Sequence, residues 1–359
     1  NWEDAVGRAT QVFAYAADFN LSLDAKVTVV KTKACAYAFY IGHIALVPRL
    51  FASRLASLVG AFLWDGKTPK IQQKFLKLSK SCGGLSLPDV PTFTKALAAK
   101  TVCKLFQDND YPGRSLLLYW TGTIRTAFTS ERYWGPQAEH PHAFYKAAAG
   151  LKRSVDGDAA EDCFAKLAPA RISEMLISRS ITDEEEQRWR PNRWKRWRNN
   201  RMPEVVTEFD WLRRWDALPT RQRLSRWGVV PNDRCPNCSK RETIRHTMFE
   251  CVAAKGVWHV VWRQFGVSVS SRGQRRRGLF EQLVFSVTMF VLWRRRCVAE
   301  ARRKPQRAAY PALQKIRMIM VRYLTEQIET QGEEAFLRRW HTRFFGVRKG
   351  NIEFPLLPF

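Results

Sequence analysis

The chain has 359 residues, of which 45% are hydrophobic, so it is long and apolar enough to bury a core and is not a disordered chain. Lys and Arg number 60 against 33 Asp and Glu, and the formal net charge of +27 favours a polyanionic partner, most simply RNA or DNA. The apolar stretches 34–47 and 279–293 fall short of the ~20 residues that span a bilayer, so no membrane association is expected.

The first residues and the cysteines indicate where in the cell the protein is expected. Residues 1–4 have neither the basic start nor the apolar run of a signal peptide, so we expect an intracellular protein of the nucleus and cytoplasm that is not secreted. The first residue is not Met, and we expect a piece of a longer protein. Five scattered cysteines are expected to be free thiols of a reducing compartment: Cys35, Cys82, Cys103, Cys163 and Cys297.

Apolar residues recur at helical spacing through the first 110 residues and predict a mainly α fold. Helices are expected over 1–19, 24–46, 48–63 and 92–106. Three lysines, Lys74, Lys77 and Lys80, would line one side of a further helix, either as a solvated face or as a track for phosphates. Lys67 and Lys70 precede them and are candidate nucleic-acid contacts. Residues 111–180 read as helices and loops with no distinctive motif.

A basic, tryptophan-rich segment follows a capping box at 182–185. Here guanidinium groups could hold phosphates while indoles stack on bases, or the tryptophans could anchor the segment to the core. The candidate contacts are Arg188, Trp189, Arg190, Arg193, Trp194, Lys195, Arg196, Trp197 and Arg198.

A metal-binding pattern, C-x2-C-x7-H-x4-C, is formed by Cys235, Cys238, His246 and Cys251. Three thiolates and one imidazole complete the closed tetrahedral shell of structural Zn²⁺, whereas a catalytic site would leave a position open for water. His246 and Cys251 are five residues apart, about 140° round an α-helix, so they cannot share a helical face and the chain must bend between them. The alternative is four unrelated residues.

Helices flank this pattern on both sides. A helix is expected from Phe209, with Phe209, Leu212 and Trp215 inward, and Thr220 would cap a second helix after Pro219. The helix after the metal pattern would turn Val257, Trp258, Val261 and Trp262 to one side.

The remaining residues form a basic tail, since residues 251–359 hold 21 basic and 7 acidic side chains. An apolar helix over 278–293 runs into Arg294, Arg295 and Arg296, which are further candidate nucleic-acid contacts. One or two amphipathic helices are expected over 311–345, with Leu313, Ile316, Ile319 and Met320 on one face. Residues 354–359 are expected to be extended and loosely held.

Several motifs in order resemble a known family. Phe62-Leu-Trp-Asp-Gly-Lys67 and Gly83-Gly-Leu-Ser-Leu-Pro-Asp89, preceded by Asn20-Leu-Ser-Leu-Asp-Ala-Lys-Val27, resemble the thumb-like region after the palm of LINE-type (non-LTR) retrotransposon reverse transcriptases. The pattern at 235–251 is similar to the zinc-binding region of the same enzymes, together with Trp211, Leu218-Pro219-Thr220, Leu224, Phe249-Glu250 and Trp258.

The resemblance, which covers about residues 1–110 and 205–265, and the composition of the other segments together predict a domain order. A thumb-like helical domain (1–110) would be followed by a helical connector (111–180), the basic Trp/Arg segment (181–204), a small zinc-knuckle domain (205–265) and a basic helical tail (266–359).

No catalytic motif accompanies these parts. Reverse transcriptases need carboxylates that hold two metal ions, and this chain has no Asp-Asp pair, Walker-type loop, Gly-x-Ser-x-Gly or His-Glu-x-x-His. The leading hypothesis is therefore a nucleic-acid-binding C-terminal portion of such a polymerase, which grips template RNA or target DNA. The alternative is a domesticated retroelement-derived protein that acts as a protein–protein interaction module.

Overall fold

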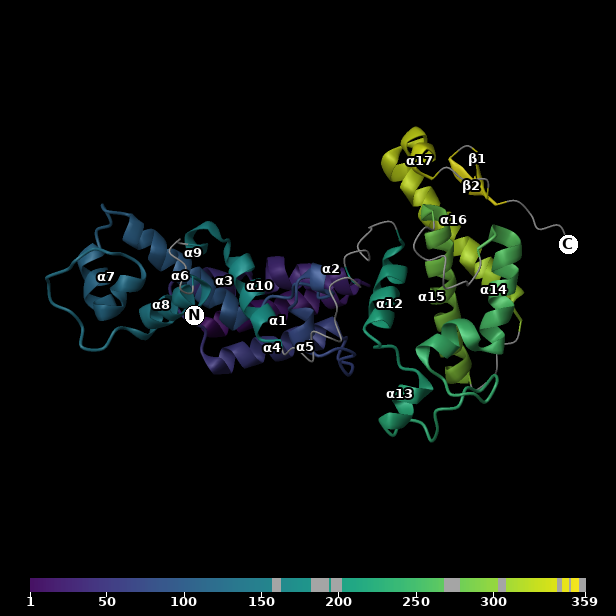
Figure 1. Ribbon diagram of the computed structural model, residues 1–359, viewed down its shortest axis with the longest axis horizontal. Helices are drawn as coiled ribbons and strands as arrows, with labels where there is room; N and C mark the ends of the chain where they lie inside the picture. The colour runs from purple at the N-terminus through teal and green to yellow at the C-terminus, as the bar shows by residue number, and fades with distance from the viewer. Residues whose placement is uncertain are drawn as a thin grey trace. The chain divides into compact units, whose positions relative to one another are not determined.

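The structure, a computed structural model, describes residues 1–156, 163–181, 194, 202–267, 278–302, 308–340, 344–348 and 350–354. Helices dominate these ranges, so the predicted mainly α fold is confirmed (Figure 1). None of the helices in the described ranges is long and apolar enough to cross a membrane. The chain forms two compact units, Asn1–Arg198 and Asn199–Phe359.

The first unit contains the four helices expected before residue 110. Three begin at side-chain caps, because Asn1, Ser22 and Asp89 accept backbone N–H groups of the first turn. The stretch 24–46 contains a π turn between two α-helices instead of one continuous helix. The elements are α1 Trp2–Ala17, α2 Leu23–Val29, η1 Val30–Ala34, α3 Ala36–Gly42, α4 Arg49–Leu63, α5 Gln73–Leu76, η2 Lys80–Cys82, α6 Val90–Gln107, α7 Arg114–Thr121, η3 Gly122–Ala127, α8 Ala143–Asp156, α9 Cys163–Lys166 and α10 Pro169–Arg179.

The predicted lysine-lined helix is wrong. Helix α5 ends after four residues, because the carbonyls of Leu76 and Leu78 accept N–H groups from the loop at 85–87 instead of continuing a helix. Lys77 forms an ion pair with Asp89, and Lys80 lies 3.5 Å from the Asp24 carboxylate. These two lysines therefore have acidic partners within the unit.

The glycine-rich motif at 83–89 is a packing element. Gly83 has φ of 84°, and a Cβ atom placed there would lie 2.3 Å from the Trp194 ring. Trp194 is 2% exposed, a placement that fits the anchor interpretation of this tryptophan. An ion pair joins the buried Lys26 of the first motif to the exposed Asp65 of the second, next to the turn at Gly66.

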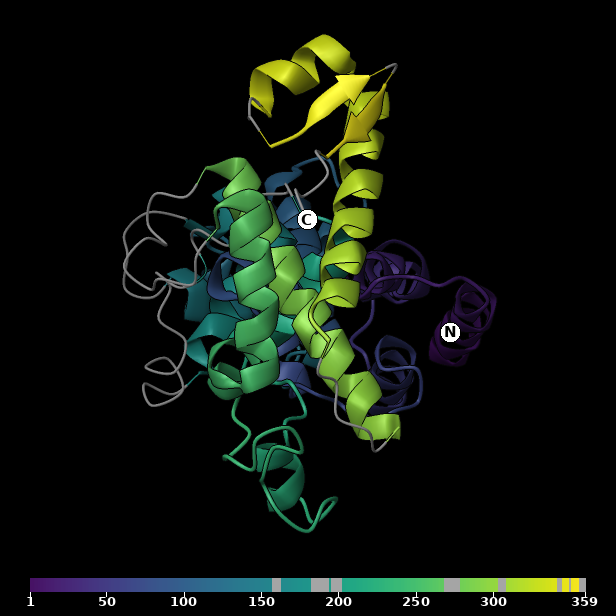
Figure 2. The same cartoon turned by 90° about the vertical axis from the view of Figure 1, so that its right-hand side faces the viewer.

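The second unit is built on three helices, α14 Val252–Phe265, α15 Leu279–Arg302 and α16 Tyr310–Gln331, which pack side by side (Figure 2). Two shorter helices precede them, α12 Glu204–Arg214 and α13 Arg221–Arg226. The π turn η5 His246–Glu250 leads into α14, and helix α17 Glu333–Arg339 follows α16. The helices expected on both sides of the metal pattern and in the tail are thus confirmed.

Four details of the second unit differ from expectation. Trp262 is 54% exposed rather than inward, and Trp211, 1% exposed, fills the core where Trp215 was expected. An antiparallel hairpin, β1 Gly346–Arg348 with β2 Asn351–Glu353, pairs Val347 with Ile352 and was not predicted. Phe354 is buried beside this hairpin and not loosely held, whereas 355–359 lie outside the described residues.

Candidate metal centre

A short hairpin carries the first two ligands. Arg234 and Arg241 form an isolated antiparallel bridge, and the Cys235 N–H donates to the Lys240 carbonyl at 2.7 Å. Between them the chain reverses through Ser239, which has φ of 58° and donates its N–H to the Cys235 carbonyl. This reversal turns Cys235 and Cys238 toward one point.

A π turn brings in the other two ligands. In η5 the Cys251 N–H donates to the His246 carbonyl at 2.9 Å, five residues back, so the two residues are separated by one wide turn. The Thr243 hydroxyl accepts the His246 N–H at 3.0 Å and fixes the start of the turn. Where a bend was expected between these two residues, the structure has a π turn that ends at Cys251 in extended geometry.

The four side chains converge in space. One ligand atom from each of Cys235, Cys238, His246 and Cys251 lies within 4.8 Å of all the others. The Cys235 and Cys251 sulfurs are 3.8 Å apart, and the Cys238 sulfur is 3.3 Å from His246 Nε2. A tetrahedral Zn²⁺ with Zn–S bonds of about 2.3 Å would separate two sulfurs by about 3.8 Å and a sulfur from a nitrogen by about 3.5 Å. The donor set and these distances fit zinc.

The protein environment favours a thiolate at this site. The hydrogen bond with Cys235 lowers the pKa of Cys251 to about 5, and N–H groups of Ala253 and Ala254 at the start of α14 add to the effect. The same hydrogen bond raises the pKa of Cys235. Zn²⁺ binds thiolates, so its binding would displace the proton from Cys235.

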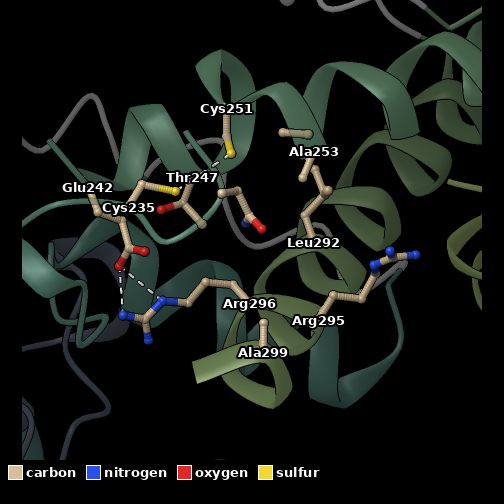
Figure 3. Close-up of a pocket in the computed structure, with 11 residues that line it drawn as sticks. Cys235, Glu242, Thr247, Cys251, Ala253, Leu292, Arg295, Arg296 and Ala299 are labelled. Atoms are coloured by element: carbon tan, nitrogen blue, oxygen red, sulfur yellow. Dashed lines mark hydrogen bonds and ion pairs between the residues drawn. The ribbon is translucent and has the colours of Figure 1, made fainter. Parts of the chain in front are cut away.

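A buried carboxylate fastens the hairpin to its surroundings. Glu242 is 1% exposed and accepts from the Arg296 Nε and NH2 groups of α15 at 3.0 and 2.6 Å (Figure 3). It also accepts the Arg221 N–H at 2.8 Å, at the start of α13. Thr220 is the N-cap residue, as expected, but its side chain makes no capping bond, and Glu242 supplies the acceptor. One carboxylate therefore links the hairpin, α13 and α15.

The π turn is held by aromatic packing. The Trp258 Nε1–H donates to the Met248 carbonyl at 2.8 Å, and Met248 is fully buried. Phe249 stacks on Trp258 and on Phe285, with ring centroids 6.2 and 6.1 Å apart. The second pair of ligands is thus fixed to α14 and α15.

A small cavity lies between the ligands and α15 (Figure 3). Its lining includes Cys235, Asn237, Cys251 and Arg295, and its volume of ≈ 30 Å³ suits a water molecule or two. A nucleotide cannot enter this space, so a polymeric ligand would have to contact the outer surface.

The predicted nucleic-acid contacts fall into three groups. Lys67, Lys70 and Arg294 are exposed. Arg295 donates to the Ala308 carbonyl, and the Arg296 side chain, 10% exposed, is paired with Glu242. The others, apart from Trp194, lie outside the described residues: Arg188, Trp189, Arg190, Arg193, Lys195, Arg196, Trp197 and Arg198.

Sequence reasoning did not single out Glu242 or Trp227. Glu242 lies among basic residues and its partner is 54 positions away, so spacing gave no signal. Trp227 follows three arginines in α13, and that composition could have been noticed.

A comparison with known families agrees with this geometry. Residues 174–258 match the family model described as zinc-binding in reverse transcriptase. The match contains all four converging residues, α12, α13 and η5. The chain therefore contains a zinc-binding region related to those of reverse transcriptases, with a Cys₃His group that could hold the metal.

Proposed function

We propose that this chain is a nucleic-acid-binding C-terminal portion of a LINE-type reverse transcriptase, in which a structural zinc centre shapes a surface for template RNA or target DNA. The observation that carries the proposal is the convergence of Cys235, Cys238, His246 and Cys251 within the segment that matches the reverse-transcriptase zinc-binding family. The four side chains would fill all four coordination positions of a tetrahedral Zn²⁺ and leave none for water or substrate, so the metal has a structural role.

The charge of the chain supports a polyanionic ligand. A net charge of +27 attracts polyanions and raises the local concentration of nucleic acid around the protein. Residues 221–241 of the matched segment hold six basic side chains and one acid. The polymerisation chemistry itself would belong to carboxylates outside this sequence, which has no Asp-Asp pair.

Metal content is the first test. We expect one Zn²⁺ per chain, loss of that metal in Cys238→Ser, and unfolding of the region around 205–265, since metal that binds only the folded state adds to folding free energy. Cys82→Ser is the matched control, because Cys82 is also a half-buried free thiol but lies in the first unit. Full zinc content in Cys238→Ser would overturn the ligand assignment.

Binding is the second test. The affinity of the zinc-loaded chain for RNA and DNA should fall steeply with salt, because each neutralised phosphate releases counterions. Affinity that does not change between low and moderate salt would contradict the proposal. A chain that binds no nucleic acid but retains protein partners after nuclease treatment would favour the interaction-module alternative.

A further inference from the structure

Helix α13 ends in an exposed tryptophan that is stacked on an arginine. The Trp227 side chain is 56% exposed, and the Arg223 guanidinium carbon lies 4.8 Å from its ring centroid. Large aromatic side chains are normally buried, and a cation against one face of an indole limits how the ring can turn. The remaining ring surface is open to solvent.

The backbone holds this tryptophan in a fixed position. Trp227 is the C-cap of α13, followed by Gly228 with φ of 70°. The Val229 N–H donates to the Leu224 carbonyl and the Gly228 N–H to the Ser225 carbonyl, at 2.9 and 3.0 Å. This is the paired hydrogen-bond pattern of a Schellman motif, so the ring is presented from a rigid helix end.

Cations from two elements meet at Gln222, the residue before Arg223. With the Gln222 amide oriented so that its oxygen faces them, Arg226 of α13 and Arg241 of the metal-binding hairpin donate to the same oxygen, at 3.3 and 3.2 Å. Arg226 is exposed, and Arg241 is exposed while it also pairs with Asp233. Two guanidinium groups that share one neutral acceptor repel each other, and an anion placed between them would relieve that repulsion.

We propose that this surface, formed by Arg223, Arg226, Trp227 and Arg241, binds single-stranded RNA or DNA. A base stacks on Trp227, and the arginines hold the neighbouring phosphates. Bases inside a duplex already stack on one another and offer no free face, so an indole platform selects unpaired strands. The inference rests on the proposed nucleic-acid-binding function and adds the strand type and the residues.

The metal centre positions this surface. Arg241 pairs with Arg234 at the base of the hairpin that carries Cys235 and Cys238, and Glu242 joins that hairpin to the start of α13. The convergence of Arg226 with Arg241 therefore depends on the hairpin being folded. This surface should lose its arrangement when zinc is removed.

The test separates stacking from charge. The zinc-loaded full chain is titrated with thymidine and uridine oligomers of about 12 nucleotides, and with an abasic deoxyribose oligomer of equal charge. Trp227→Ala should weaken binding of the base-containing strands roughly tenfold or more and leave the abasic strand unchanged, and Trp227→Phe should restore most of the affinity. The uridine and thymidine arms show whether RNA or DNA is preferred.

Two further variants complete the design. Arg226→Gln should weaken binding of all three oligomers and lower the salt dependence by about one counterion. Trp262→Ala is the matched control, since Trp262 is 54% exposed in the same unit and its ring neighbours His259. Zinc content and melting temperature of each variant report whether the unit is still folded.

The outcomes are distinct. If the unmodified chain binds none of the oligomers, the proposed function fails with the inference. If it binds with the expected salt dependence, but Trp227→Ala and Trp262→Ala have equal effects, only the inference is overturned. Equal loss on base-containing and abasic strands in Trp227→Ala would likewise exclude stacking at this residue.

Discussion

Replacement of Glu242 by Gln should destabilise the second unit without touching a metal ligand. The change keeps the size of the side chain and one acceptor oxygen but removes the negative charge. The Arg296 side chain, 10% exposed, would then keep only its longer contact with the Glu300 carboxylate, at 3.9 Å, and the Arg221 N–H at the start of α13 would have a weaker acceptor.

The size of the effect follows from burial. Removal of one partner from a buried ion pair costs about 3–5 kcal/mol, and the retained amide oxygen and the Glu300 carboxylate place this variant at the lower end, about 3 kcal/mol. The unit Asn199–Phe359 has 359 − 198 = 161 residues. With an unfolding entropy of about 2.1 cal/mol/K per residue, a loss of about 3 kcal/mol lowers the melting temperature by about 9 °C.

Calorimetry at a fixed free zinc concentration measures this shift. The melting transition that moves to lower temperature when a chelator removes zinc is that of the second unit. The control is Glu250→Gln, because Glu250 pairs with Arg245 at the surface, where ion pairs contribute about 0–1 kcal/mol. A Glu242→Gln variant that melts with the unmodified protein, or no lower than Glu250→Gln, would refute the structural role of this carboxylate.

Three other variants test separate features. Gly83→Ala should destabilise the first unit in urea by about 1–3 kcal/mol, because its methyl group would meet the Trp194 ring and the backbone is left-handed there. Ser239→Gly should raise the melting temperature slightly, by removing up to about 1 kcal/mol of strain at φ of 58°. Burial opposes the ionisation of Asp210, but the charges of Arg213 and Arg214 outweigh it and lower its pKa. Its stabilisation is therefore present above about pH 4 and is lost as the pH falls further, and in Asp210→Asn this part of the acid dependence should disappear from unfolding curves. An acid profile identical to that of the unmodified chain would contradict the last prediction.

The features that could be predicted are those that depend on residues close together in the sequence. Periodicity located α1, α4 and α6, and the spacing of the Cys and His residues pointed to the four side chains that converge in the structure. These features are encoded within windows of fewer than about 20 residues, where helical period and turn residues carry the information.

The remaining features depend on distant partners. Lys77 was expected on a helix face and instead pairs with Asp89, because a loop at 85–87 takes the carbonyls that a helix would need. The ion pair between Glu242 and Arg296 joins positions 54 residues apart, and both side chains lie inside the second unit. Neither composition nor spacing contains that pairing, so it could not be predicted from one sequence.

The wide turn at His246–Glu250 has an evolutionary consequence. It accommodates one residue more than an α-helical turn would, and this surplus lets the imidazole face the sulfurs while Met248 and Trp258 keep their own contacts. Deletion of a single codon here would tighten the turn and rotate His246 by about 100° relative to Cys251. Homologous chains should therefore tolerate substitutions in this stretch far better than changes in its length.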